Sequence, residues 1–137
     1  MLFRFYTMNA NLGFSIPINV FGPGLRIAHR GTIVINKNAR TGDNCRIHAC
    51  TNIGSNLDEV SAPQIGNNMY IGPGAKIFGN VVIADNITIG ANSVVNKSFC
   101  EKSISIAGIP AKKINIKGLD DIMVTATQIV KNNPALQ

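Results

Sequence analysis

IGNNMYIGPGAKIFGNVVIADNITIGANSVV, residues 65–95, carries a β-branched apolar residue at every sixth position. A period of six matches neither the 3.6-residue period of an α-helix nor the two-residue period of a strand. It is typical of a parallel β-helix, in which each six-residue unit supplies one short strand and one corner. The register comprises Ile65, Ile71, Ile77, Ile83, Ile89 and Val95, and four positions after these come Met69, Ala75, Val81, Ile87, Ser93 and Phe99.

The same register extends toward the N-terminus. It begins at Phe21, Leu25 and Ile27, and we place a slip of two residues after Ile33. The Ile and Val side chains are expected to point into the coil, while Gly, Asn and Asp turn the corners, where positive φ is accessible to them. The register then resumes at Ile35, Thr41, Ile47 and Ile53, with small partners at Ala39, Cys45 and Thr51.

The 137 residues are expected to form a single domain, in which other segments flank or interrupt the repeat. Residues 1–14 show no period and are expected to form an irregular cap before a β-helix over residues 15–106. Within the coil, GSNLDEVSAPQ at residues 54–64 breaks the pattern and is expected to be an extruded loop, where functional residues often lie. Residues 107–118 form a tail, and helical spacing over residues 119–131 predicts a helix that covers the open end of the coil.

Composition restricts the class of protein. The chain is 45% hydrophobic but only 6% aromatic, which suits a narrow coil lined by Ile, Val and Ala. No apolar run approaches the roughly 18 residues of a membrane span, and the N-terminus does not resemble a signal peptide. The three cysteines, Cys45, Cys50 and Cys100, lack CxxC spacing. We therefore expect reduced thiols, a cytoplasmic location and no membrane partner.

The formal net charge is +6, but the basic residues are mostly scattered. A nucleic-acid binder usually carries a dense basic stripe interleaved with aromatic residues, so a nucleic-acid partner is not expected. One local cluster, at Lys112, Lys113 and Lys117, suits a small polyphosphorylated ligand. A solvated cationic surface is the alternative interpretation.

The only two histidines are His29 and His48. Three six-residue strands make one coil, so with the slip after Ile33 we expect His29 to lie over Ala49, next to His48. Both imidazoles would then share one outer face. Histidine is the usual general base near neutral pH. The alternative is that either histidine is an ordinary corner residue.

The repeats, GLRIAHRGTIVI at residues 24–35 and AGIPAKKI at residues 107–114 together resemble the serine acetyltransferases. These are hexapeptide-repeat acyltransferases with a left-handed parallel β-helix that act as homotrimers. The resemblance covers about residues 15–116. It implies an all-β fold with a C-terminal α-helix and an acetyl-CoA-dependent transfer of acetyl to the L-serine hydroxyl, in cysteine biosynthesis.

By the same resemblance, His29 is the general base. From their shared face of the coil, we expect His48 to be a secondary catalytic residue that orients His29 or binds the acceptor. Lys112 and Lys113 would meet the phosphates of CoA, and amides near Gly54 would stabilise the oxyanion. Small residues let the pantetheine arm approach the backbone closely. The remaining CoA contacts implied by the match are Gly54, Ser55, Gly72, Pro73, Ala75, Ala91 and Asn92.

Several positions depart from that family. Ala28 replaces the carboxylate that precedes the catalytic histidine, Phe14 replaces the carboxylate that orients it, and Ala62 replaces a second histidine. We expect no counterpart, within residues 1–14, of the long helical domain that precedes the β-helix in the family. We expect the acceptor to lie near Ala28, Asp58 and Glu59, with acidic groups of the loop acting across a subunit boundary.

Three alternatives remain open. A sugar or nucleotide-sugar hydroxyl, as in surface polysaccharide synthesis, is a second acceptor class. A zinc carbonic anhydrase on this fold needs three histidine ligands, which two histidines fit badly, so we predict no metal site. A non-catalytic β-helix that serves assembly is the third.

Overall fold

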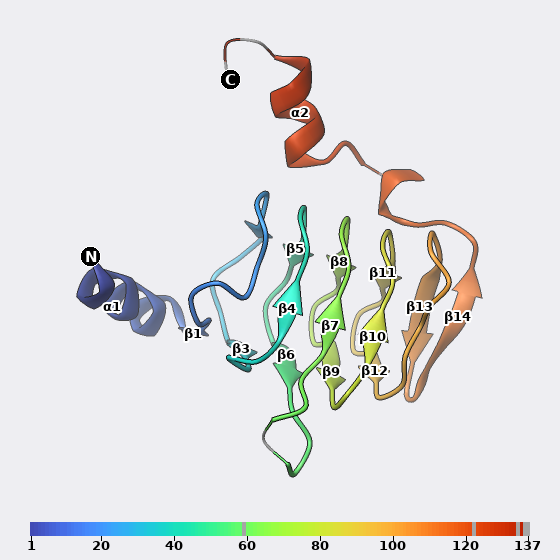
Figure 1. Cartoon of the computed structure of the whole chain (residues 1–137), viewed down its shortest axis with the longest axis horizontal. Coiled ribbons are helices and arrows are strands. Elements are labelled where there is room, and N and C mark those ends of the chain that lie inside the picture. The colour runs from blue at the N-terminus through green and yellow to red at the C-terminus, as the bar shows by residue number, and fades with distance from the viewer. Residues whose placement is uncertain (59, 122, 134, 136–137) are drawn as a thin grey trace.

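The structure is a computed structural model that describes residues 1–58, 60–121, 123–133 and 135. Its strands form a parallel β-helix with three sheets (Figure 1), as the six-residue period predicts, and the coil is left-handed, as the resemblance implies. Sheet A contains β1 (Phe14–Ser15), β3 (Ile33–Ile35), β6 (Thr51–Gly54), β9 (Lys76–Phe78) and β12 (Val94–Val95). Sheet B contains β4 (Arg40–Thr41), β7 (Gln64–Ile65) and β10 (Val82–Ile83). Sheet C contains β2 (Arg26–Ile27), β5 (Arg46–Ile47), β8 (Tyr70–Ile71), β11 (Thr88–Ile89), β13 (Ser105–Gly108) and β14 (Ala111–Asn115).

The isoleucines of the repeat stack on one another inside the coil. In sheet A, Ile35 pairs with Ile53, which pairs with Ile77, and all three are buried. In sheet C the corresponding row is Ile47, Ile71, Ile89 and Ile106, each fully buried. Consecutive residues of a strand point to opposite faces, so the residue before each buried isoleucine lies on the outer surface.

The slip of two residues lies before Ile33, not after it as the sequence suggested. Ile27 pairs with Ile47 and Ile33 with Thr51. Residues 28–32 therefore form the same turn as residues 48–50 of the next coil, with two residues more. Ile33 and Ile35 are two apart in one strand and are both buried. Either residue could therefore carry the apolar register, which is why the sequence did not locate the insertion.

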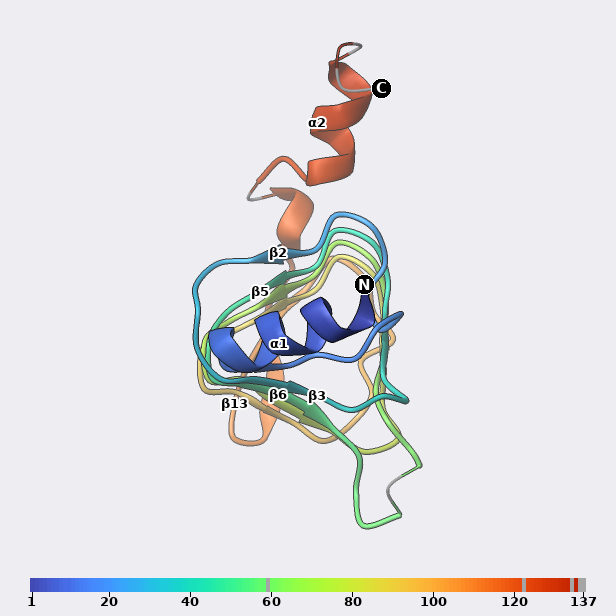
Figure 2. The same ribbon diagram turned by 90° about the vertical axis from the view of Figure 1, so that its left-hand side faces the viewer.

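Residues 1–14 are not irregular, because Leu2–Leu12 forms helix α1. The helix ends at Gly13, whose φ of 77° is left-handed, and it has no buried residue. A helix that buries no face carries no apolar period, which explains the wrong expectation. Viewed from this end, α1 lies across the mouth of the coil (Figure 2).

The C-terminal segment is helical over a shorter range than expected. Leu119–Asp121 forms a 3-10 helix (η1) and Ala126–Asn132 forms α2, which starts with a capping box between Thr125 and Gln128. Ile122 of the expected helix lies outside the described residues.

Helix α2 does not cover the open end of the coil. Asn44 accepts a hydrogen bond from the Thr127 N–H and donates one to its hydroxyl, at 3.1 and 2.8 Å, so α2 lies beside an earlier coil (Figure 1). The sheet C edge ends instead in the antiparallel pair β13–β14. Among the described residues, no helix is long and apolar enough to cross a membrane.

Candidate active site

The insertion before Ile33 shapes the corner that holds the first histidine. We call the turns between sheets C and A, residues 28–32, 48–50, 72–75 and 90–93, the C–A corner. Ala28 still follows the register, because its N–H donates to the Ile47 carbonyl at 3.1 Å. A Cβ on Gly31 would lie 3.0 Å from the Ala49 Cβ, so Gly31 rather than His29 lies over Ala49. The two extra residues bulge outward, and His29 and Arg30 are exposed.

His48 sits on the same corner in a very different environment. Its side chain is only 9% exposed, and Nδ1 lies 3.0 Å from the Ile71 carbonyl oxygen. A carbonyl only accepts, so Nδ1 carries the proton and Nε2 of the neutral ring is left as an acceptor. The Tyr70 ring packs against the imidazole at a centroid distance of 4.9 Å. His48 is therefore held rigidly, whereas His29 makes no hydrogen bond within the described part of the chain.

Four residues predicted to contact CoA line the next two coils of the C–A corner. Gly72 donates to the Ile89 carbonyl and Asn92 to the Pro73 carbonyl, both at 2.9 Å, so these corners stack. A Cβ on Gly72 would lie 2.8 Å from backbone atoms of the neighbouring coil, which leaves room for glycine alone. Pro73, Ala91 and Asn92 are exposed, so the corner presents small residues and backbone to solvent. Ala75 differs, because its side chain is fully buried in the core.

The other predicted residues lie at the far edge of sheet A. Gly54 ends β6, and Ser55 accepts a hydrogen bond from Asn36 Nδ2 at 3.1 Å where the loop leaves the coil. Hydrogen bonds from the Ser61 side chain and backbone, and from Val60 N–H, lower the pKa of Asp58. Glu59 lies outside the described residues. Within one chain, strand β6 separates these loop residues from the histidines.

The two predicted phosphate-binding lysines differ in their neighbours. Ala107 stacks on Gly90, because its Cβ would meet a Cβ placed on that glycine. Lys112 pairs in register with Ala107, so it lies one strand beyond the last coil of the C–A corner. Lys113 instead forms an ion pair with Glu101. Both are exposed, but only the charge of Lys113 is locally compensated.

Two positions at which the family carries catalytic groups are occupied here by apolar residues that pack in the coil. Phe14 packs against the core cluster and Ala62 is 4% exposed within it. Neither side chain can act on a substrate. The described residues also include no group of three His, Cys, Asp or Glu side chains that could hold a metal ion.

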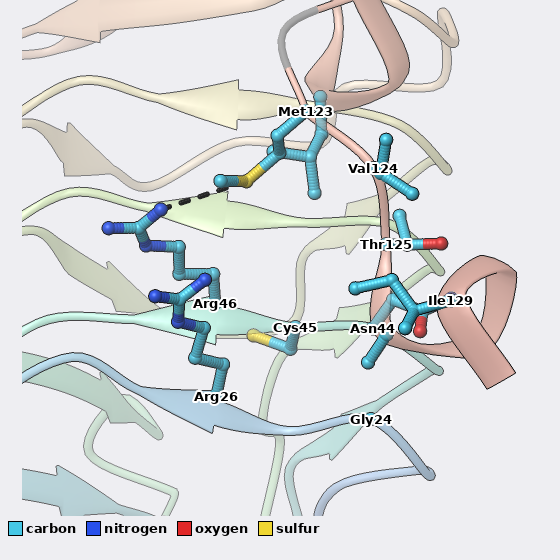
Figure 3. A pocket seen from close by; sticks show the side chains of 11 residues that line it. Gly24, Arg26, Asn44, Cys45, Arg46, Met123, Val124, Thr125 and Ile129 are labelled. Carbon is cyan, nitrogen blue, oxygen red and sulfur yellow. Dashed lines mark hydrogen bonds between the residues drawn. The ribbon is translucent and has the colours of Figure 1, made fainter. Parts of the chain in front are cut away.

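Sequence reasoning missed a further group on the outer face of sheet C. Arg26 and Arg46 are in register on adjacent strands and border a cavity of about 80 Å³ under the C-terminal segment (Figure 3). The Arg46 guanidinium lies 5.8 Å from the centre of the Tyr70 ring, the same ring that packs on His48. The available signal was their place one residue before an isoleucine of the inward-facing register, which puts each of them on the outer surface.

Residues 62–97 match the family described as bacterial transferase hexapeptide (six repeats). Serine acetyltransferase from Staphylococcus xylosus is 38% identical over 99 residues, which are 71% of this chain and 45% of that protein. The chain spans less than half the length of the curated relatives it matches.

Solved structures show the same likeness. Serine acetyltransferase from Brucella abortus in complex with coenzyme A has a TM-score of 0.66 and 34% identity, over 72% of this chain and 40% of that one. The Neisseria gonorrhoeae serine acetyltransferase in complex with serine has a TM-score of 0.62 and 34% identity, over 69% and 38% of the two chains.

Proposed function

The chain belongs to the hexapeptide-repeat family and is of the serine acetyltransferase type, and on that premise we propose that it is an acetyl-CoA-dependent O-acetyltransferase. The observation that carries the proposal is the two-residue bulge at the C–A corner. It projects His29 into solvent beside corners built of glycine and other small residues. A base next to a surface that a thioester can approach closely is what acyl transfer requires.

In this proposal His29 takes the proton of the acceptor hydroxyl as the oxygen attacks the thioester carbonyl. The new C–O bond gives a tetrahedral oxyanion, which backbone N–H groups stabilise. The C–S bond then breaks, and the imidazolium returns the proton to the departing CoA thiolate. No other reactant is needed, since the acetyl group and the proton exchange partners.

CoA would lie along the C–A corner, with its acetyl end at His29 and its phosphates toward β14. Gly72, Pro73, Ala91 and Asn92 line that path and Lys112 lies near its far end. Lys113 contributes less, because Glu101 already neutralises it. Known relatives support this assignment, since one solved serine acetyltransferase of similar fold holds coenzyme A.

The complete site requires a second subunit. Gly54, Ser55 and Asp58 belong to the edge of sheet A opposite the C–A corner, so they cannot reach His29 of their own chain. A homotrimer would bring the loop of one subunit to the histidine of the next. A cytoplasmic location, where acetyl-CoA is made, belongs to the same proposal.

L-serine is the first candidate acceptor, because a solved relative holds serine. A sugar or nucleotide-sugar hydroxyl is the second, because Ala28 stands where the family has its acceptor-binding carboxylate. The test is release of CoA thiol from acetyl-CoA with L-serine, homoserine and nucleotide sugars. Thiol release that depends on one acceptor supports the proposal. No release with any acceptor would favour a non-catalytic assembly role.

A further inference from the structure

Two arginines lie side by side on the outer face of sheet C. Arg26 pairs in register with Arg46, and adjacent parallel strands are about 4.8 Å apart. Figure 3 shows both side chains extending the same way, away from Asn44 and Cys45. Like charges directly opposite each other on neighbouring strands repel, so this arrangement needs a compensating charge.

The described part of the chain does not supply that charge. Its ion pairs join Lys102 to Asp85 and Lys113 to Glu101, and neither involves an arginine. Arg46 Nη1 donates only to the sulfur of Met123, a weak acceptor, at 3.8 Å. Among the described residues, the buried Arg46 Nε has no hydrogen-bond acceptor. A buried charged donor without an acceptor is unfavourable, and an oxyanion bound at the guanidinium groups would supply the missing negative charge.

The arginines lie close to the C–A corner along their strands. Along their strands, Ala28 and His48 follow two residues later on the same outer face, a distance of about 7 Å at 3.3 Å per residue. The Tyr70 ring contacts both the Arg46 guanidinium and the His48 imidazole, at 5.8 and 4.9 Å. A group held by the arginines is therefore within the length of a small molecule from the histidines.

We infer that Arg26 and Arg46 bind an oxyanion, a carboxylate or a phosphate, carried by the hydroxyl acceptor. Each guanidinium presents a planar fork of donors that matches both groups. The acceptor would enter with its oxyanion on the arginines and its hydroxyl toward the bulged corner. This assignment rests on the proposed acetyl transfer, and it supplies the acceptor anchor that the residues at positions 28 and 62 do not.

The test measures binding without acetyl-CoA. L-serine, glucose 1-phosphate and inorganic phosphate are titrated calorimetrically into the full chain and into Arg26→Gln and Arg46→Gln. Arg40→Gln is the matched control, because Arg40 lies on sheet B and donates to the Lys37 and Ala39 carbonyls. Binding of L-serine identifies a carboxylate source, and binding of glucose 1-phosphate a phosphate source. Either affinity should fall at least tenfold in both variants and stay unchanged in the control.

Arg46→Lys keeps a positive charge and a long apolar stem, so it can be tested in place of Arg46→Gln if the glutamine variant does not fold. It should still bind more weakly, because it lacks the fork. Equal affinities in all variants, or binding of inorganic phosphate alone, would overturn the inference. In the thiol-release assay the variants should raise KM for the acceptor more than they lower kcat. Thiol release with unchanged KM refutes the arginine site alone, whereas arginine-dependent binding without thiol release refutes the acetyl transfer alone.

Discussion

Replacing His48 by alanine tests whether this imidazole is held as rigidly as its contacts indicate. The change removes the hydrogen bond from Nδ1 to the Ile71 carbonyl, which contributes about 1 kcal/mol. It also removes the ring contact with Tyr70, which contributes about 0.5–1.5 kcal/mol. We therefore expect the free energy of unfolding to fall by about 2 kcal/mol.

Thermal and urea unfolding would measure this loss. For a domain of this size, about 2 kcal/mol corresponds to a fall in Tm of roughly 6–8 °C. His29→Ala is the matched control, because His29 is exposed and makes no hydrogen bond within the described residues. Its stability should change by no more than about 0.5 kcal/mol.

A conservative variant separates the hydrogen bond from the ring contact. His48→Asn places an amide N–H near the position of Nδ1, so it should recover roughly half of the loss by keeping the bond to Ile71. If His48→Ala were as stable as the wild type, neither contact would hold the ring.

Three further changes have definite outcomes. Gly72→Ala should lower the free energy of unfolding in urea by about 1–3 kcal/mol, because its Cβ would meet the next coil's backbone at 2.8 Å; unchanged stability would show that the coils separate freely. Lys112→Ala should weaken CoA binding more than Lys113→Ala, and more at low than at high ionic strength, because Glu101 already neutralises Lys113; calorimetry showing equal losses would contradict this. Burial raises the pKa of Cys45 from 9.0 to about 12, so at high pH the unfolded chain loses a proton that the folded chain keeps. Stability should fall by about 1 kcal/mol between pH 9 and 10, and Cys45→Ala should abolish that part of the pH dependence.

The coil could be predicted from the sequence because its determinant is local and repeated. Each β-branched residue at the sixth position fills the same narrow interior, so the period alone gives the strand, the corner and the stacking. The insertion was misplaced because Ile33 and Ile35 satisfy the same burial rule. Helix α1 was missed because it buries nothing, and the C-terminal helix was placed too early because its start depends on the capping box at Thr125.

The site was less predictable than the fold. Resemblance pointed to His29, but the bulge that exposes it depends on which coil residues pair across space. Arg46 and Tyr70 were missed because outer positions of a β-helix tolerate any residue type. Arg46 pairs in register with Tyr70, 24 residues later in the sequence, and this pairing brings both residues to His48. A period of six predicts such pairs but does not assign a role to them.

The proposed chemistry depends on His29 acting as the base, and a single-turnover measurement tests this most directly. With saturating acetyl-CoA and the acceptor that supports thiol release, His29→Ala should slow acetyl transfer by about 10²–10⁴-fold. Its affinity for CoA should remain close to that of the wild type, since in the proposed mechanism the imidazole contacts the acceptor hydroxyl and not CoA. Full-rate transfer by His29→Ala would contradict the account.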